Sequence, residues 1–92
     1  MQNQIEQNAI IVPDKKTARA VLANVAVGHT TTIKLNDFHL STRLIENEKY
    51  TRLYQCFVGF DDKNAESMNT HEKLMNRIDE ILNSIENLSN RK

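Results

Sequence analysis

The most regular pattern in the chain is an apolar repeat in its last third. Apolar residues recur there at alternating spacings of four and three positions, which is typical of one face of a long amphipathic helix. The repeat consists of Leu74, Ile78, Ile81, Ile85 and Leu88, and Met68, Met75 and Leu82 widen it into a broad stripe. Water does not favour so large an apolar surface. We therefore expect the helix to lie on a sheet, on a second copy of the chain or on another protein.

The width of this stripe argues against a simple two-stranded coiled coil. In such a coiled coil, charged residues flank the apolar seam and pair between the helices. Here Met75 and Leu82 occupy flanking positions, so the stripe is too wide and too uncharged. We expect the helix to pack against a sheet and to share its remaining apolar surface with a second copy. A wholly intramolecular lid and a helix that enters a groove of another protein are the alternatives. The predicted oligomer interface comprises Leu74, Ile78, Ile81, Leu82, Ile85 and Leu88.

The first third of the chain predicts a short strand followed by a helix. Residues 9–12 form a β-branched apolar run that Pro13 stops, which indicates a short strand at the edge of a sheet. Asp14 is a good N-cap, and apolar residues follow at helical spacing until Gly28 closes the segment. Small and β-branched residues also alternate over 21–27, so a strand is the alternative there.

Three strands are predicted in the middle of the chain. The first two runs are 30–35 and 38–45; side chains alternate in character through the second, and Asn36-Asp37 between the runs is typical of a turn. The strand predicted over 50–60 is apolar on both faces, which favours an inner position in the sheet. Asp61-Asp62 then has the side chains that cap a helix, and we expect the long helix to begin there.

The predicted fold class is α+β. The elements are a short N-terminal strand, a helix, a three-stranded antiparallel meander and the long C-terminal amphipathic helix. Residues 1–8 are polar and are expected to be a flexible N-terminal segment, and residues 9–92 are expected to form a single α+β domain.

Composition adds three constraints. The aromatic content is 5% and there is no Trp, so the core is thin for a chain of 92 residues and oligomerisation would help to stabilise it. The formal net charge is zero, so no overall field attracts nucleic acid or an anionic membrane, and association is favoured over repulsion. Cys56 is the only cysteine, which fits the reducing cytoplasm, and no apolar run is long enough to span a membrane.

Basic residues suggest one binding surface. Lys15, Lys16 and Arg19 cluster at the start of the first predicted helix, and two further arginines lie in the predicted strands. The candidate partner-binding patch comprises Lys15, Lys16, Arg19, Arg43 and Arg52, and it could contact a phosphate backbone. The order helix, three strands, helix resembles the double-stranded RNA-binding domain in outline. The basic start of the final helix in such domains is replaced here by residues 61–64, which read Asp-Asp-Lys-Asn.

A second resemblance concerns the last predicted strand. Residues 54–61, followed by a helix, resemble the closing strand of PilZ domains, which are receptors for cyclic-di-GMP. That family binds its ligand through an arginine pair and an Asp/Asn-x-Ser-x-x-Gly element. Residues 37–42 are the nearest match, and they lack the serine and the glycine at the required places. The chain is therefore not assigned to the family.

No pattern in the sequence predicts chemistry. His29, His39 and His71 lack metal-ligand spacing, and Cys56 lies in the most apolar strand without a base nearby in the sequence. We therefore predict no catalytic, cofactor or metal site. The predicted function is that of a small, non-enzymatic, oligomeric interaction protein that docks onto or inhibits another macromolecule, as phage and mobile-element inhibitors do. The expected partners are a second copy and another protein. The alternative is a nucleic-acid-binding regulator that uses the basic patch.

Overall fold

The computed structural model describes residues 9–46, 48–49 and 51–90, so the predicted flexible segment 1–8 lies outside the described residues. The protein is α+β, as predicted, with two helices and a five-stranded mixed sheet. In chain order the elements are β1 (Ile10–Val12), α2 (Lys15–Leu22), β2 (Thr30–Leu35), β3 (Phe38–Glu46), β4 (Arg52–Val58), a 3-10 turn η1 (Asp62–Asn64), β5 (Glu66–Met68) and α3 (His71–Asn90).

The sheet is wider than the predicted meander. Its strands lie in chain order, and β2, β3 and β4 form the predicted antiparallel meander. β1 adds to one side, parallel to β2, and β5 adds to the other side, antiparallel to β4. The edge position of β1 and the inner position of β4 are therefore confirmed. Asn36 turns the chain between β2 and β3 with a φ of 58°, a left-handed conformation that asparagine tolerates.

The start of α2 is confirmed and its predicted end is wrong. The Asp14 carboxylate accepts a hydrogen bond of 2.8 Å from the Thr17 amide, which is the predicted cap. The helix stops at Leu22 rather than continuing to Gly28. β-Branched residues in 25–27 favour extended backbone, and this segment pairs with β3, where the Gly28 amide donates to the Leu44 carbonyl at 3.3 Å.

Asp14→Ala is expected to lower the urea midpoint of unfolding, whereas Asp14→Asn, which keeps a side-chain acceptor, should preserve most of the stability. The hydrogen bonds from Thr17 lower the pKa of Asp14 below its ordinary value of 3.8. Because the folded-state pKa is depressed, the cap contributes stability above about pH 4, and this contribution is lost as the pH falls through the folded-state pKa. Urea titrations at pH 7 and below pH 4 measure both effects. Equal midpoints for Asp14→Ala and the unchanged protein at pH 7 would exclude the cap.

The long helix begins at His71, so the prediction that Asp61-Asp62 caps it is wrong. The Asp61 carboxylate instead accepts from the Lys63 amide and caps the short turn η1. The chain then extends through Ala65 and pairs with the edge of β4 as β5. The Thr70 hydroxyl accepts from the Lys73 amide and caps the first turn of α3. Residues 66–68 therefore pair with the backbone of β4 instead of forming the first turns of the predicted helix.

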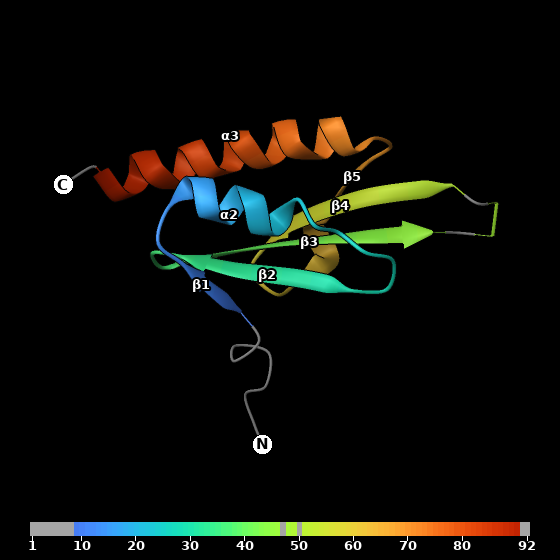
Figure 1. Cartoon of the computed structure of the whole chain (residues 1–92), viewed down its shortest axis with the longest axis horizontal. Helices are drawn as coiled ribbons and strands as arrows, with labels where there is room; N and C mark the ends of the chain where they lie inside the picture. Colours follow the sequence, from blue (N-terminus) through green and yellow to red (C-terminus); the bar gives the residue numbers. More distant parts are fainter. Residues whose placement is uncertain (1–8, 47, 50, 91–92) are drawn as a thin grey trace, which may run out of the picture.

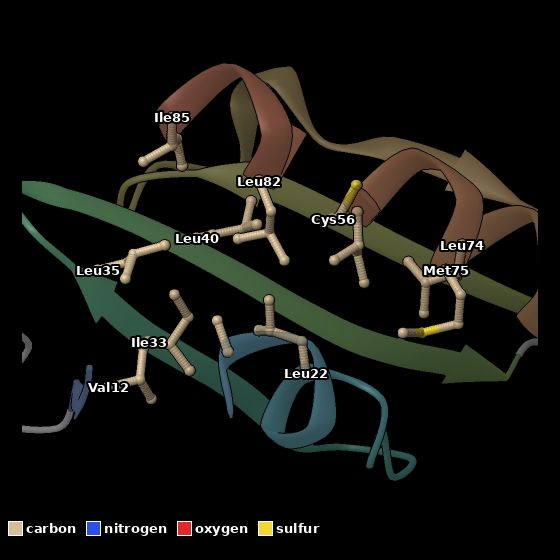
Figure 2. Close-up of a cluster of buried hydrophobic side chains, with 12 residues drawn as sticks. Val12, Leu22, Ile33, Leu35, Leu40, Cys56, Leu74, Met75, Leu82 and Ile85 are labelled. Atoms are coloured by element: carbon tan, nitrogen blue, oxygen red, sulfur yellow. The ribbon is translucent and has the colours of Figure 1, made fainter. Parts of the chain in front are cut away.

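Both helices cover the same face of the sheet (Figure 1). Figure 2 shows Leu74, Met75, Leu82 and Ile85 of α3 pointing toward the strands, with Leu22 of α2 beside them. The strands contribute Val12, Ile33, Leu35, Leu40 and Cys56 to the same cluster. The core thus lies between one helical layer and one face of the sheet, and the helices leave the opposite face uncovered.

Candidate functional site

The predicted oligomer interface lies mostly inside the molecule. Leu74, Ile78 and Leu82 are fully buried against the sheet, and Ile85 is 5% exposed. Ile81 is partly buried, and Leu88 is 53% exposed. The four buried side chains therefore have the environment of an intramolecular lid. Only Ile81 and Leu88 of the predicted set present apolar surface on the outside of α3.

The basic residues of α2 are used to hold the two helices together. The Lys15 ammonium donates to the Asn83 side-chain oxygen at 2.6 Å and lies 3.5 Å from the Glu86 carboxylate. Arg19 Nε donates to Asp79 at 2.6 Å. These exposed ion pairs run from α2 to α3. The charges of Lys15 and Arg19 are therefore balanced by carboxylates of the neighbouring helix.

The structure does not bring the five predicted patch residues together. Lys15, Lys16 and Arg19 lie on α2, in the helical layer. Arg52 pairs with Glu46 at 3.4 Å, where the register places these two residues opposite each other in β4 and β3. Arg43 lies on the other face of the sheet, among side chains that point away from both helices.

We call this second face the uncovered sheet face. Side chains alternate along a strand, so the neighbours of core residues in each strand point away from the helices. Strand register aligns these outward side chains in rows across the sheet. The uncovered sheet face comprises Ile11, Thr30, Thr32, Lys34, His39, Ser41, Arg43, Ile45, Leu53, Gln55, Phe57 and Ser67. It is the candidate functional site, because it combines a fixed cation with a hollow.

Neither α2 nor α3 covers this face, but the segment that follows β4 folds over part of it, where Thr32, Ser41 and Phe57 are buried. Gly59 turns the chain with a φ of 81°, a backbone conformation that side chains other than glycine rarely adopt. The Ser41 hydroxyl donates to the Gly59 carbonyl at 2.9 Å, so the Thr32 hydroxyl must be the donor in the 2.7 Å contact with Ser41. The Phe60 ring contacts the His39 ring at a centroid distance of 4.7 Å. Among the described residues, the buried Nε2 of His39 has no hydrogen-bond partner.

Arg43 is the best-fixed cation on the uncovered sheet face. Its Nε–H donates to the Gln55 oxygen at 2.7 Å, and one Nη1–H donates to Asp62 at 3.0 Å. Its guanidinium carbon lies 5.4 Å from the centroid of the Phe57 ring, within cation–π range. Gln55 is itself oriented, because its amide donates to the Ser67 hydroxyl at 2.7 Å. This chain of contacts crosses β3, β4 and β5 and holds the guanidinium in one orientation.

Two hollows flank Arg43. The first has a volume of about 270 Å³ and combines hydroxyls, aromatic rings and one ion pair. Its lining residues are Thr30, Thr32, Ser41, Arg43, Phe57, Phe60 and Asp62. The second, of about 390 Å³, is lined by Val27, Gly28, His29, Thr30, Arg43, Leu44, Ile45 and Glu46. Thr30 and Arg43 line both hollows, which therefore adjoin at these two side chains and are together called the depression. The second hollow also reaches Leu44 and residues 27–29, at the start of β2.

The other reactive side chains do not assemble a site. Burial is the largest cause that raises the pKa of the Cys56 thiol to about 11; Glu66 adds to it and Arg77 opposes it. The thiol is therefore protonated at neutral pH and a poor nucleophile. In the part of the chain that the structure describes, no three His, Cys, Asp or Glu side chains gather as a metal site would require. No helix of that part is long and apolar enough to cross a membrane.

No protein family, curated protein or solved structure matches the chain.

The sequence analysis does not identify the uncovered sheet face as a separate surface, although one signal for it is present. Polar residues occupy every second position of β2 and β3, at Thr30, Thr32 and Lys34 and again at His39, Ser41 and Arg43. The sequence did not reveal that both helices cover the other face.

Proposed function

We propose that the protein is a non-enzymatic binding protein that docks onto another protein through the uncovered sheet face. The observation that carries this proposal is the asymmetry of the sheet. Both helices cover one face, and the other face bears the first hollow, with the oriented guanidinium of Arg43 between it and the adjoining second hollow. Ligand sites in proteins are typically concave and carry a few well-placed polar groups. The uncovered sheet face has both features.

The hydrogen bonds of the depression favour binding over catalysis. A hydroxyl nucleophile needs a general base within hydrogen-bond reach. The Ser41 hydroxyl instead donates to a backbone carbonyl and accepts from Thr32. Cys56 lies in the core on the opposite face of the sheet, with a raised pKa. These partners hold the side chains in place and do not activate them, which supports a docking surface.

The placement of charge favours a protein partner over nucleic acid. A protein that tracks a phosphate backbone presents several cations along one surface. Of the predicted patch, only Arg43 lies on the uncovered sheet face, and the Asp62 carboxylate opposes it. Lys15 and Arg19 pair with acidic residues of α3. The nucleic-acid alternative therefore has less support from the described residues.

A photo-crosslinking amino acid at two matched positions tests this proposal in the native host. Thr30 is exposed on the uncovered sheet face, and Asn76 is exposed on the outer side of α3. We expect a crosslinked protein, identified by mass spectrometry, from position 30 and none from position 76. The adduct from position 30 should disappear in an Arg43→Glu background. An adduct formed only from position 76 would overturn the proposal and make the outer side of α3 the docking surface.

A further inference from the structure

The guanidinium of Arg43 has unused binding capacity. Arginine carries five N–H donors, and the described contacts use one on Nε and one on Nη1. Gln55 and the ring of Phe57 fix its orientation without occupying the remaining donors. A preorganised guanidinium is suited to bidentate contact with a carboxylate, because the two groups are planar and match in geometry.

The carboxylate that Arg43 already contacts is replaceable. The side chain of Asp62 is 53% exposed, and Asp62 belongs to the three-residue turn η1. Only 25% of the Arg43 side chain is exposed, but water solvates the more exposed Asp62 carboxylate, so exchanging this partly exposed partner costs little net free energy. The contact nevertheless identifies the chemistry that this position accepts, because a carboxylate lies on the guanidinium at the edge of the first hollow.

The shape around Arg43 fits an extended segment better than a compact small molecule. Arg43 and Thr30 line both hollows, so one hollow lies on each side of the guanidinium. An extended peptide could place one side chain on Arg43 and its neighbours in the two hollows. We infer that Arg43 binds a carboxylate of an acidic, extended segment of the partner protein, which takes the place of Asp62. This inference rests on the proposed function and names the chemistry of the partner.

The exchange replaces one carboxylate by another. On binding, the Asp62 carboxylate leaves Nη1 and is solvated by water, while the incoming carboxylate accepts from the free N–H groups of Arg43. Asp62 thereby competes with the partner, and any fraction of time that it occupies Arg43 weakens the apparent affinity. A variant that cannot form this ion pair should bind more tightly than the unchanged protein.

Fluorescence anisotropy with a labelled oligoglutamate peptide tests the exchange at an ionic strength of about 0.01 M, where screening is weak. Asp62→Asn is expected to tighten binding about threefold, the equivalent of one partly exposed ion pair. Asp37→Asn makes the same charge change in the β2–β3 turn and should tighten binding less.

A second pair of variants tests the guanidinium. Arg43→Lys should weaken binding about tenfold, because lysine keeps the charge and loses the planar fork. Arg52→Lys, the same change at the exposed Arg52–Glu46 pair, should have no effect.

Four results would overturn the inference, and the fourth, failure of oligoglutamate to bind, also separates it from the docking function. The first is weaker binding by Asp62→Asn than by the unchanged protein, and the second is equal losses for Arg43→Lys and Arg52→Lys. The third is tighter binding of an oligothymidylate than of oligoglutamate, which would assign the depression to phosphate groups. Circular dichroism of each variant confirms that it is folded. If oligoglutamate fails to bind while position 30 still crosslinks to a partner, the carboxylate inference is wrong and the docking function stands.

Discussion

Leu82→Asp is expected to unfold the protein, whereas Leu88→Asp should leave it folded. Leu82 is fully buried between α3 and the sheet, and Leu88, six residues farther along the same helix, is 53% exposed. Truncation of a buried leucine alone costs about 2–5 kcal/mol, and an unpaired buried carboxylate adds to this loss. A surface substitution usually changes the free energy of unfolding by less than about 0.5 kcal/mol.

Circular dichroism and urea unfolding measure this difference directly, and light scattering adds the oligomeric state. If the exposed end of α3 mediates self-association, Leu88→Asp will reduce the molecular mass in solution without unfolding the chain. Similar stability losses in the two variants would contradict the packing of α3 on the sheet and would place Leu88 in a contact that the monomer does not contain.

Thr42→Val is expected to lower the free energy of unfolding by about 1–3 kcal/mol, because it removes a buried hydrogen bond at nearly constant volume. The fully buried Thr42 hydroxyl donates to the Leu22 carbonyl at 3.2 Å. Leu22 is the last residue of α2, where backbone carbonyls lack partners within the helix. The valine variant leaves this carbonyl without the hydroxyl donor in a buried environment.

Thr31→Val is the matched control for this prediction. Thr31 lies opposite Thr42 in the register of β2 and β3, and its hydroxyl has no hydrogen-bond partner among the described residues. The same chemical change at Thr31 should therefore alter the free energy of unfolding by less than about 0.5 kcal/mol. Equal losses at the two positions, measured by urea titration, would show that the Thr42 hydroxyl does not stabilise the end of α2.

The sequence predicts those parts of the fold that depend on local signals. Asp14 has the side chain that a helix cap requires, and Asn36 has the tolerance for left-handed backbone that the turn requires. Alternating side chains over 38–45 predict β3, and the turn signal at Asn36-Asp37 places β2 before it. The apolar stripe of α3 is apparent from its helical spacing, and five of its side chains are buried on one face, namely Leu74, Met75, Ile78, Leu82 and Ile85.

Two features, the pairing of β5 and the separation of the basic residues, depend on contacts between segments that are distant in the sequence. Residues 66–68 pair with the edge of β4, and nothing in their own sequence requires this pairing. The five predicted patch residues separate for the same reason. Lys15 and Arg19 turn toward carboxylates of α3, which lie more than fifty positions away in the chain, while the alternation of β3 places Arg43 on the opposite face. Such partners become apparent only when the layers are assembled.

The most direct test of docking through the uncovered sheet face is an NMR titration with the partner captured from position 30. The Nε–H signal of Arg43 reports on its contacts with Gln55 and Asp62, and the backbone amides report on each strand. We predict that the Arg43 signal shifts together with amides of β2, β3, β4 and η1, while the amides of Asn76 and Asn87 on the outer side of α3 remain unchanged. Shifts confined to α3, with the Arg43 signal unaffected, would contradict docking through this face.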